Sequence, residues 1–258
     1  MLKGLYTAYT GMINEQHRMD TLTNNLANAS TVGFKKEGST SQSFDDILTV
    51  KIKDSSQGAY LTKRMGMNNP GVKIGENYTD FTQGSFRITG NTYDLALAGE
   101  GFFAIEFTNK AGETSTMYTR AGQFTLNTEG YLVTDDGDYV LDTQNRRIRL
   151  NPLQDAQIDD YGRITQNGTV AATIQVADFE DYNYLEKYAE TYYRPAEGAR
   201  PTEGTALVKS GYLEMANFQI VSEMVNLISI TRAYESNQKI IQTYDSSLEI
   251  ATTQLGRV

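Results

Sequence analysis

A glycine-rich string after an apolar run is the first candidate for chemistry. Gly99, Gly101 and Ala104 give the spacing G-x-G-x-x-A, which in dinucleotide-binding proteins joins a strand to a helix. The helix is needed there because its free N–H groups bind the pyrophosphate. Here Phe103–Phe107 alternates between apolar and polar or small residues, which predicts a strand. We therefore expect a tight hairpin at this string and no cofactor.

An acidic cluster is the second candidate, for metal binding. Asp135, Asp136 and Asp138 surround Gly137, as in part of a calcium-binding loop. Such a loop requires Glu at its twelfth position, and the twelfth residue from Asp135 is Arg146. The cluster therefore predicts a solvated hairpin tip and no metal site.

Catalytic groups are scarce in this sequence. Cysteine is absent and His17 is the single histidine, which excludes thiolate chemistry and multi-histidine metal sites. His17 lies two residues before the apolar Met19 and is expected to face away from the apolar stripe. No nucleophile-elbow, zinc-protease or phosphate-loop string occurs, and nothing singles out a pair of carboxylates. We expect no enzyme activity and no catalytic residues.

The charge balance restricts the partners. The 258 residues include 23 Lys and Arg against 32 Asp and Glu, which gives a net charge of −9. Phosphate binding needs a basic surface, so we expect no nucleic-acid partner. No run of 18 apolar residues occurs, so we expect no transmembrane segment.

The C-terminal part predicts one long helix. Glycine and proline are absent between Gly211 and Gly256, and apolar residues recur there every seven positions. A sustained seven-residue repeat in a helix indicates packing against other helices. The residues of this row are Ile220, Leu227, Tyr234, Ile241, Leu248 and Leu255. The positions four residues after each are mostly polar, which favours packing among several helices, some from other copies.

The N-terminal part carries a matching repeat, in Leu5, Met12, Met19 and Leu26. We expect this helix to end in the run that contains Asn24, Asn25 and Asn28, because asparagine is a weak helix former and a good turn former. Gly33 then breaks the helix and is expected to adopt a backbone angle that a Cβ disfavours.

The middle of the chain, roughly residues 70–205, predicts an all-β domain. Short alternating runs are separated by turn pairs such as Asp136-Gly137 and Asn167-Gly168, a pattern typical of antiparallel hairpins, a small sandwich or a barrel. The Tyr-rich segment 180–204 predicts an irregular surface loop or extension, whose role stays open.

Together these features predict an α+β fold. Long N- and C-terminal helices form a coiled-coil-like domain, and an all-β domain is inserted between them. We expect an N-terminal helix over 1–34, an extended linker over 35–70, a β-rich outer domain over 71–205, and a linker strand with the C-terminal helix over 206–258.

Four sets of strings resemble the bacterial flagellar hook–basal body rod protein family. The first is the stretch 24–36, which includes Asn24, Asn25, Asn28, Gly33 and Phe34. The others are 90–103, 118–133, and 211–245, which ends in Gln-Thr-Tyr-Asp. They occur in order along the whole chain and are most like those of the distal or proximal rod subunits.

The resemblance implies a structural subunit of the basal-body rod that assembles into a helical tube and transmits torque from motor to hook. The implied partners are further copies, other rod and hook subunits and the flagellar export apparatus, and the implied location is the basal body in the cell envelope. The repeat rows are then the self-assembly residues. A soluble coiled-coil adaptor, or another hook or junction component that does not polymerise, is the alternative.

Overall fold

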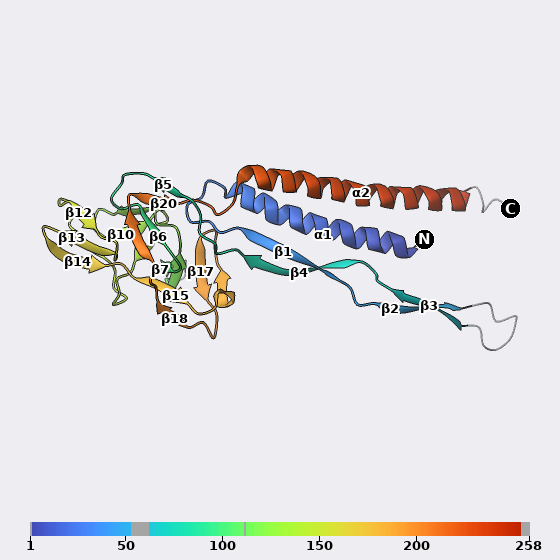
Figure 1. The fold of residues 1–258 in the computed structure, drawn as a ribbon, viewed down its shortest axis with the longest axis horizontal. Coiled ribbons are helices and arrows are strands. Elements are labelled where there is room, and N and C mark those ends of the chain that lie inside the picture. The colour runs from blue at the N-terminus through green and yellow to red at the C-terminus, as the bar shows by residue number, and fades with distance from the viewer. Residues whose placement is uncertain (1, 53–61, 111, 254–258) are drawn as a thin grey trace. The chain divides into compact units, whose positions relative to one another are not determined.

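The computed structural model describes residues 2–52, 62–110 and 112–253. The chain divides into two compact units. The helical unit comprises residues 1–26, 37–79 and 219–258, and the β unit comprises residues 27–36 and 80–218. The expected terminal helices and the expected β-rich middle of the chain are both present (Figure 1).

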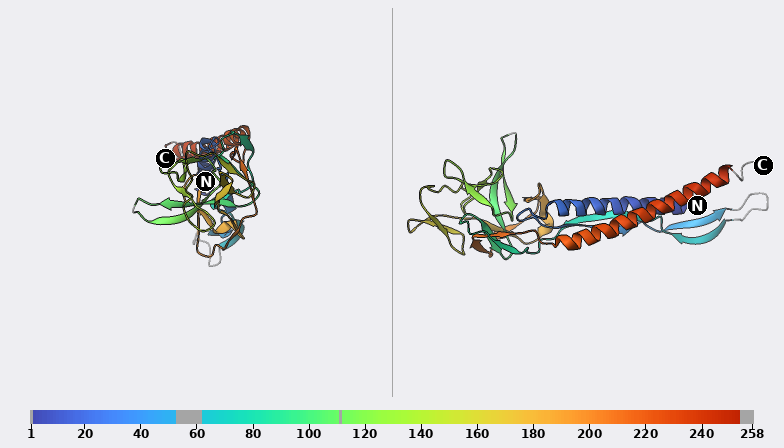
Figure 2. Two further views of the ribbon diagram at one scale, coloured as in Figure 1. Left: turned by 90° about the vertical axis from the view of Figure 1, so that its left-hand side faces the viewer. Right: turned by 90° about the horizontal axis from the view of Figure 1, so that it is seen from above.

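The two helices of the helical unit run antiparallel, side by side (Figures 1 and 2). They are α1 (Leu2–Ala27) and α2 (Ile220–Thr253). Glycines on α1 allow a close approach: the Tyr244 ring lies over Gly4, and a Cβ at Gly11 would lie 3.1 Å from the Asn237 amide nitrogen. Because Gly4 and Gly11 are seven residues apart, as are Tyr244 and Asn237, the contacts repeat along one face of each helix.

Four strands complete the described part of the helical unit. β1 (Glu37–Ser43) pairs antiparallel with β4 (Val72–Thr79), and β2 (Ile47–Ile52) pairs antiparallel with β3 (Thr62–Asn68). Polar side chains join α1 to these strands. The Ser41 hydroxyl lies 3.0 Å from Asn14 Oδ1, and His17 Nε2 lies 3.0 Å from Asn77 Oδ1.

The expected coiled-coil-like domain is wrong. Both terminal helices exist, but they share their unit with two strand pairs, and α1 forms hydrogen bonds with β1 and β4. The physical reason lies in the polar residues of α1. Asn14 is buried, and a buried amide requires hydrogen-bond partners, which the strand Ser41 supplies and an apolar helix seam would not.

The β unit is built on one large antiparallel sheet. In the described residues its main path runs β16, β17, β8, β7, β11, β10, β9, with β15 paired to β7 and β18 paired to β15. The bounds are β7 Phe102–Thr108, β8 Thr114–Thr119, β9 Phe124–Leu126, β10 Leu132–Thr134, β11 Tyr139–Val140, β15 Val176–Phe179, β16 Leu185–Lys187, β17 Tyr192–Pro195 and β18 Pro201–Glu203.

Smaller strand groups surround this sheet. β5 (Phe86–Ile88) pairs with β20 (Tyr212–Glu214), and β6 (Leu95–Ala98) pairs with β19 (Leu207–Ser210). The strands β12 (Ala156–Ile158), β13 (Arg163–Gln166) and β14 (Thr169–Thr173) form a further antiparallel sheet. The largest apolar cluster of the unit contains Leu95, Leu97, Phe103, Phe124, Leu132, Val140, Ile148, Ile164, Ile174 and Val208.

The glycine-rich string is a turn between strands, but it is not a hairpin. Gly99 and Gly101 have φ angles of 125° and 131°, and the strand β7 follows them. β6 and β7 pair with other strands and not with each other. The acidic cluster 135–138 forms the turn between β10 and β11, where Gly137 N–H donates to the Thr134 carbonyl.

The segment 180–204 is more ordered than expected. It contains the short 3₁₀ helix η2 (Tyr182–Tyr184) and the strands β16, β17 and β18. Tyr193 is fully buried against Phe102, with ring centroids 5.6 Å apart. Because its aromatic side chains complete a core cluster, the segment is an integral part of the β unit.

Candidate functional site

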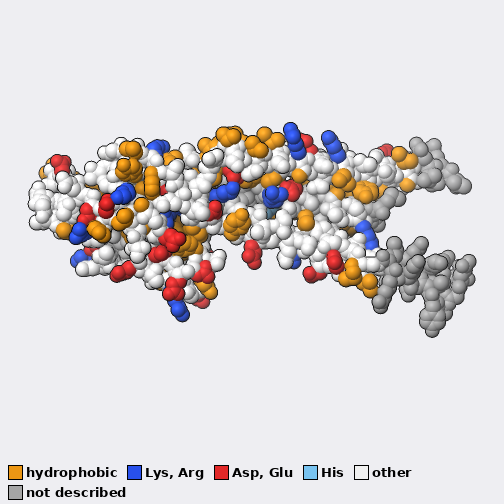
Figure 3. Space-filling view, viewed as in Figure 1, with side chains coloured by type: hydrophobic (Ala, Val, Ile, Leu, Met, Phe, Trp, Pro, Cys, Tyr) orange, Lys and Arg blue, Asp and Glu red, His pale blue; other side chains and the backbone are white. Residues whose placement is uncertain are grey.

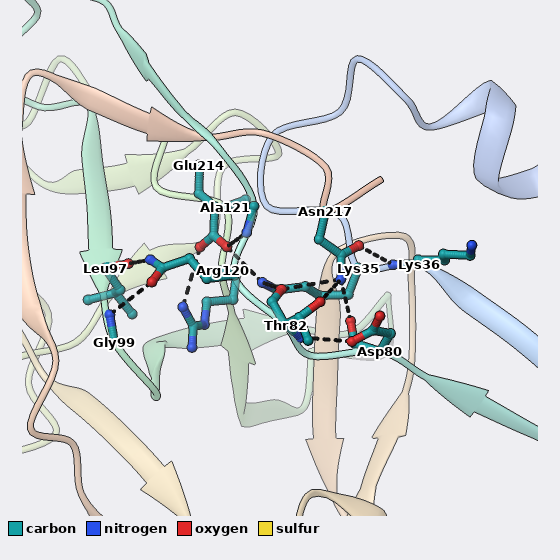
Figure 4. Close-up of polar contacts among 12 residues, drawn as sticks. Lys35, Lys36, Asp80, Thr82, Leu97, Gly99, Arg120, Ala121, Glu214 and Asn217 are labelled. Carbon is teal, nitrogen blue, oxygen red and sulfur yellow. Dashed lines mark hydrogen bonds and ion pairs between the residues drawn. The ribbon is translucent and has the colours of Figure 1, made fainter. Parts of the chain in front are cut away.

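The chain passes between the two units at four points, after residues 26, 36, 79 and 218. Within the β unit, the segments next to these points are 27–36, the loop that follows Asp80, and the stretch around Glu214 that leads to α2. These segments meet in one polar cluster (Figure 4). We call the cluster the junction site, and its central residues are Lys35, Arg120, Glu214 and Asn217.

Glu214 is the centre of the junction site. Its carboxylate accepts hydrogen bonds from Lys35 Nζ at 2.7 Å and from Gly84 N–H at 2.8 Å through Oε1, and from Arg120 Nη1 at 3.3 Å through Oε2. All three ionised side chains are buried: Glu214 is 0 % exposed, Lys35 1 % and Arg120 3 %. One carboxylate therefore binds two cations from distant parts of the chain.

The surroundings of Lys35 disfavour the charged form of its side chain. Burial lowers the pKa of the Lys35 ammonium below its usual range, and this desolvation outweighs the raising effect of Glu214. Lys35 also donates to the Thr82 carbonyl at 2.8 Å, and the Arg120 guanidinium lies 5.3 Å from the centroid of the Phe102 ring. These contacts partly replace the water that each cation loses on burial.

Asn217 adds a second layer of hydrogen bonds. Its Oδ1 accepts from Lys36 N–H at 2.8 Å, and its Nδ2 donates to the Asp80 carbonyl at 2.7 Å. Asp80 N–H in turn donates to the Lys36 carbonyl at 2.8 Å. One amide side chain thus joins the segment after α1 to the segment after β4.

Gly33 and Phe34 place Lys35. Gly33 has a φ of 70°, in the left-handed region that favours glycine, and its N–H donates to the Glu214 carbonyl at 2.8 Å. A Cβ at Gly33 would overlap the backbone nitrogen of Ala121. Phe34 is fully buried, and Lys187 Nζ lies 4.4 Å from its ring centroid.

The three asparagines of the same stretch have different positions. Asn25 is buried and forms two hydrogen bonds with the backbone of Glu37. Its Nδ2 donates to the Glu37 carbonyl at 2.8 Å, and its Oδ1 accepts from Glu37 N–H at 3.0 Å. Asn28 is buried and its Oδ1 accepts from the Thr31 hydroxyl at 3.1 Å. Asn24 lies on the exposed side of α1.

The repeat rows lie along half-buried faces of the helices. Half-buried positions are Leu5, Met12, Met19, Leu26, Leu227, Tyr234, Ile241 and Leu248. Ile220 is exposed, and Leu255 lies outside the described residues. A second row on α2 lies three residues after the first. In it Ile230 is buried, and Asn237, Tyr244 and Ala251 are half-buried.

Sequence reasoning missed the ion triad. Lys35 and Glu214 are 179 positions apart, and Arg120 and Glu214 are 94 apart, so no local spacing reveals the pairing. A signal was present: Lys35, Arg120 and Glu214 each stand inside one of the strings that carry the family resemblance.

Other features of the described residues bear on partners and cofactors. No group of three His, Asp or Glu side chains in the described part of the chain is arranged to hold a metal ion. Within that same part, neither helix combines the length and the apolar character needed to cross a membrane.

Family models match three parts of the chain. The model described as "Flagella basal body rod protein" matches residues 5–35, "Flagellar hook protein FlgE/F/G D1 domain" matches 96–172, and "Flagellar basal body rod FlgEFG protein C-terminal" matches 209–255. The junction site has residues in all three matched segments.

Curated relatives match along almost the full length. The flagellar basal-body rod protein FlgG of Bacillus subtilis is 34 % identical over 96 % of this chain and 97 % of its own length. The rod protein FlgF of Caulobacter vibrioides is 32 % identical over all of both chains. The flagellar hook-basal body complex protein FlhO of Bacillus subtilis is 30 % identical over all of both chains.

The protein is a structural component of the bacterial flagellum, not an enzyme. The chain belongs to the flagellar basal-body rod protein family, is a structural subunit of the rod, and is located in the basal body.

Removing the charge of Glu214 is expected to lower the stability of the β unit strongly. Glu214→Gln leaves two buried cations without a counter-charge, so we expect the free energy of unfolding of the β unit to fall by about 3–5 kcal/mol. Urea unfolding followed by circular dichroism measures this loss. Glu186→Gln is the matched control, because Glu186 pairs with Arg194 at the surface and should cost at most about 1 kcal/mol. Equal losses in the two variants would contradict a central role for Glu214.

Gly33→Ala tests the path of the chain into Lys35. We expect about 1–3 kcal/mol of backbone strain and a further cost of about 1–3 kcal/mol from overlap with Ala121. Gly137→Ala is the control, because Gly137 also has a positive φ but a Cβ there meets no neighbour within 4 Å. The same unfolding measurement should show the larger loss for Gly33→Ala, and similar losses would show that close packing is unimportant.

Proposed function

We propose that this rod subunit assembles with further copies of itself into a helical tube that transmits torque from motor to hook. The observation that carries the proposal is the pair of half-buried repeat rows on α1 and α2. In one chain these side chains keep part of their surface exposed, so neighbouring subunits can bury the remainder. Burial of apolar surface favours that association.

We further propose a division of labour between the two units. The terminal segments 1–34 and 206–258 are proposed to supply the contacts of the inner tube, residues 35–70 to link, and residues 71–205 to form the outer layer. The helical unit also includes β4 up to Thr79, so the strands beside α1 belong to the inner contacts in this proposal. The flagellar export apparatus is proposed as the transient partner that delivers the chain.

The junction site supports a role in torque transmission. A load applied along α1 or α2 reaches the β unit through the chain segments that end at Lys35 and Glu214. Those segments are joined by a buried ion pair and by backbone hydrogen bonds, and a close-packed interior resists shear. Flexible connections would absorb the twist before it reached the outer layer.

Counting copies tests the assembly. Quantitative mass spectrometry of purified hook–basal bodies should find the chain enriched, with several copies per particle. Sedimentation of concentrated protein should show mass that rises without a plateau. A plateau at a small fixed mass, together with absence from the particles, would contradict the polymer and favour a soluble adaptor.

Leu227→Asp tests the repeat row. A carboxylate in the half-buried row should abolish incorporation into the rod, because the charge would have to be buried without a partner, while the β unit stays folded. Ser236→Asp is the control, since Ser236 is exposed on the opposite side of the same helix, and it should enter the rod normally. The measurements are the variant's amount in purified basal bodies and its circular dichroism. Normal rods that contain the Leu227→Asp chain would refute the role of this row.

A further inference from the structure

The start of α2 carries an apolar face that the described residues of its own unit leave exposed. The residues Ile220, Val221, Met224, Val225 and Ile228 are between 45 % and 73 % exposed, and we call them the α2 patch. They recur every three or four positions and therefore share one face of the helix. Hydrophobic side chains gather along the first half of α2 (Figure 3). Further along, the same face carries the exposed charges Arg232, Glu235 and Lys239.

A second exposed patch lies near the start of α1. Tyr6, Tyr9 and Ile13 are between 38 % and 62 % exposed, and their spacing of three and four residues places them on one face. We call them the α1 patch. The same face continues with polar residues, Gln16 and Asp20.

The two patches lie at different heights along the helix pair. Tyr244 lies over Gly4 and Asn237 faces Gly11, so the α1 patch is level with the part of α2 near Lys239. The α2 patch is centred about 15 residues earlier, which at 1.5 Å per residue is roughly 22 Å away along the axis. One chain cannot cover either patch with the other.

We propose that the α2 patch of one copy binds the α1 patch of a second copy. This inference rests on the proposed self-assembly and names its contact surface. Because the two patches differ and are displaced along the axis, the contact is heterologous and repeats from copy to copy. Such a contact extends an open polymer and does not close a pair.

Two observations favour another copy of the chain as the occupant. Each patch is the uncharged part of an otherwise charged or polar helix face. The two patches are therefore complementary in their apolar character, and neither is complementary to a charged surface. Both patches also lie inside the segments that match rod-protein family models, 5–35 and 209–255. Exposed apolar patches of this kind mark protein–protein contacts.

The natural chain has no cysteine, so introduced thiols report the contact without background. Rods that assemble from the Tyr9→Cys, Val225→Cys double variant should give a ladder of multiples on a denaturing gel after treatment with a short bismaleimide. Each single variant should stay monomeric. Dimers from Val225→Cys alone would show a like-with-like contact and overturn the proposal, as would a crosslink to a different flagellar chain.

A matched control uses the residue next to Val225. Asn226 is also exposed but points about 100° away around the helix, so the Tyr9→Cys, Asn226→Cys double variant should give at most a tenth of the ladder. Equal ladders from the two double variants would overturn the proposal.

An assembly measurement covers the case in which cysteine at Tyr9 prevents incorporation. Val225→Asp should lower the amount of chain in purified rods at least tenfold, whereas Asn226→Asp should leave it unchanged. Equal incorporation would overturn the patch contact. If the natural chain were abundant in rods while the ladder was absent, the contact would be wrong and self-assembly would stand. If the natural chain did not polymerise at all, self-assembly itself would be wrong.

Discussion

The carboxylate of Glu214 is the group on which the junction of this molecule depends. It is fully buried and binds the side chains of Lys35 and Arg120. Without it, two cations would stand in a medium that solvates them poorly. Each of the three residues belongs to a different stretch of chain, so the native positions of all three stretches are required at once. The cluster therefore joins three distant stretches through charge-assisted, directional contacts.

The lowered pKa of Lys35 shows what this arrangement costs. Burial lowers the pKa of the Lys35 ammonium, and Glu214 acts in the opposite direction; a buried ion pair is in general weak evidence for net stability. Its value lies in geometry. Glu214 is followed within a few residues by Asn217, whose amide binds Lys36 and Asp80. Directional hydrogen bonds within the β unit thereby hold the segment after α1, the segment after β4 and the segment before α2 together.

Periodicity predicted the local structure well and the tertiary contacts poorly. The seven-residue rows marked both helices, the absence of glycine marked α2 in addition, and alternation marked strands such as β7. The coiled-coil-like domain was wrong because the pattern of α1 shows apolar positions but not the partner of the buried Asn14, which is Ser41 on β1. The ion triad could not be predicted for a similar reason. Lys35 pairs with a residue 179 positions away, and nothing in the neighbouring sequence distinguishes it from a lysine at the surface.

The faces of α2 that pack inside its own unit decide which of its apolar residues remain available to a neighbour. Leu227 is half-buried and Ile230 is buried, whereas Met224 and Ile228 point outward with about half of their surface exposed. Each square ångström of apolar surface that a neighbour covers contributes about 25 cal/mol. One such patch is a weak contact, but in the proposed polymer every copy would repeat it. Modest patches at displaced positions therefore favour growth along an axis over collapse into a closed pair.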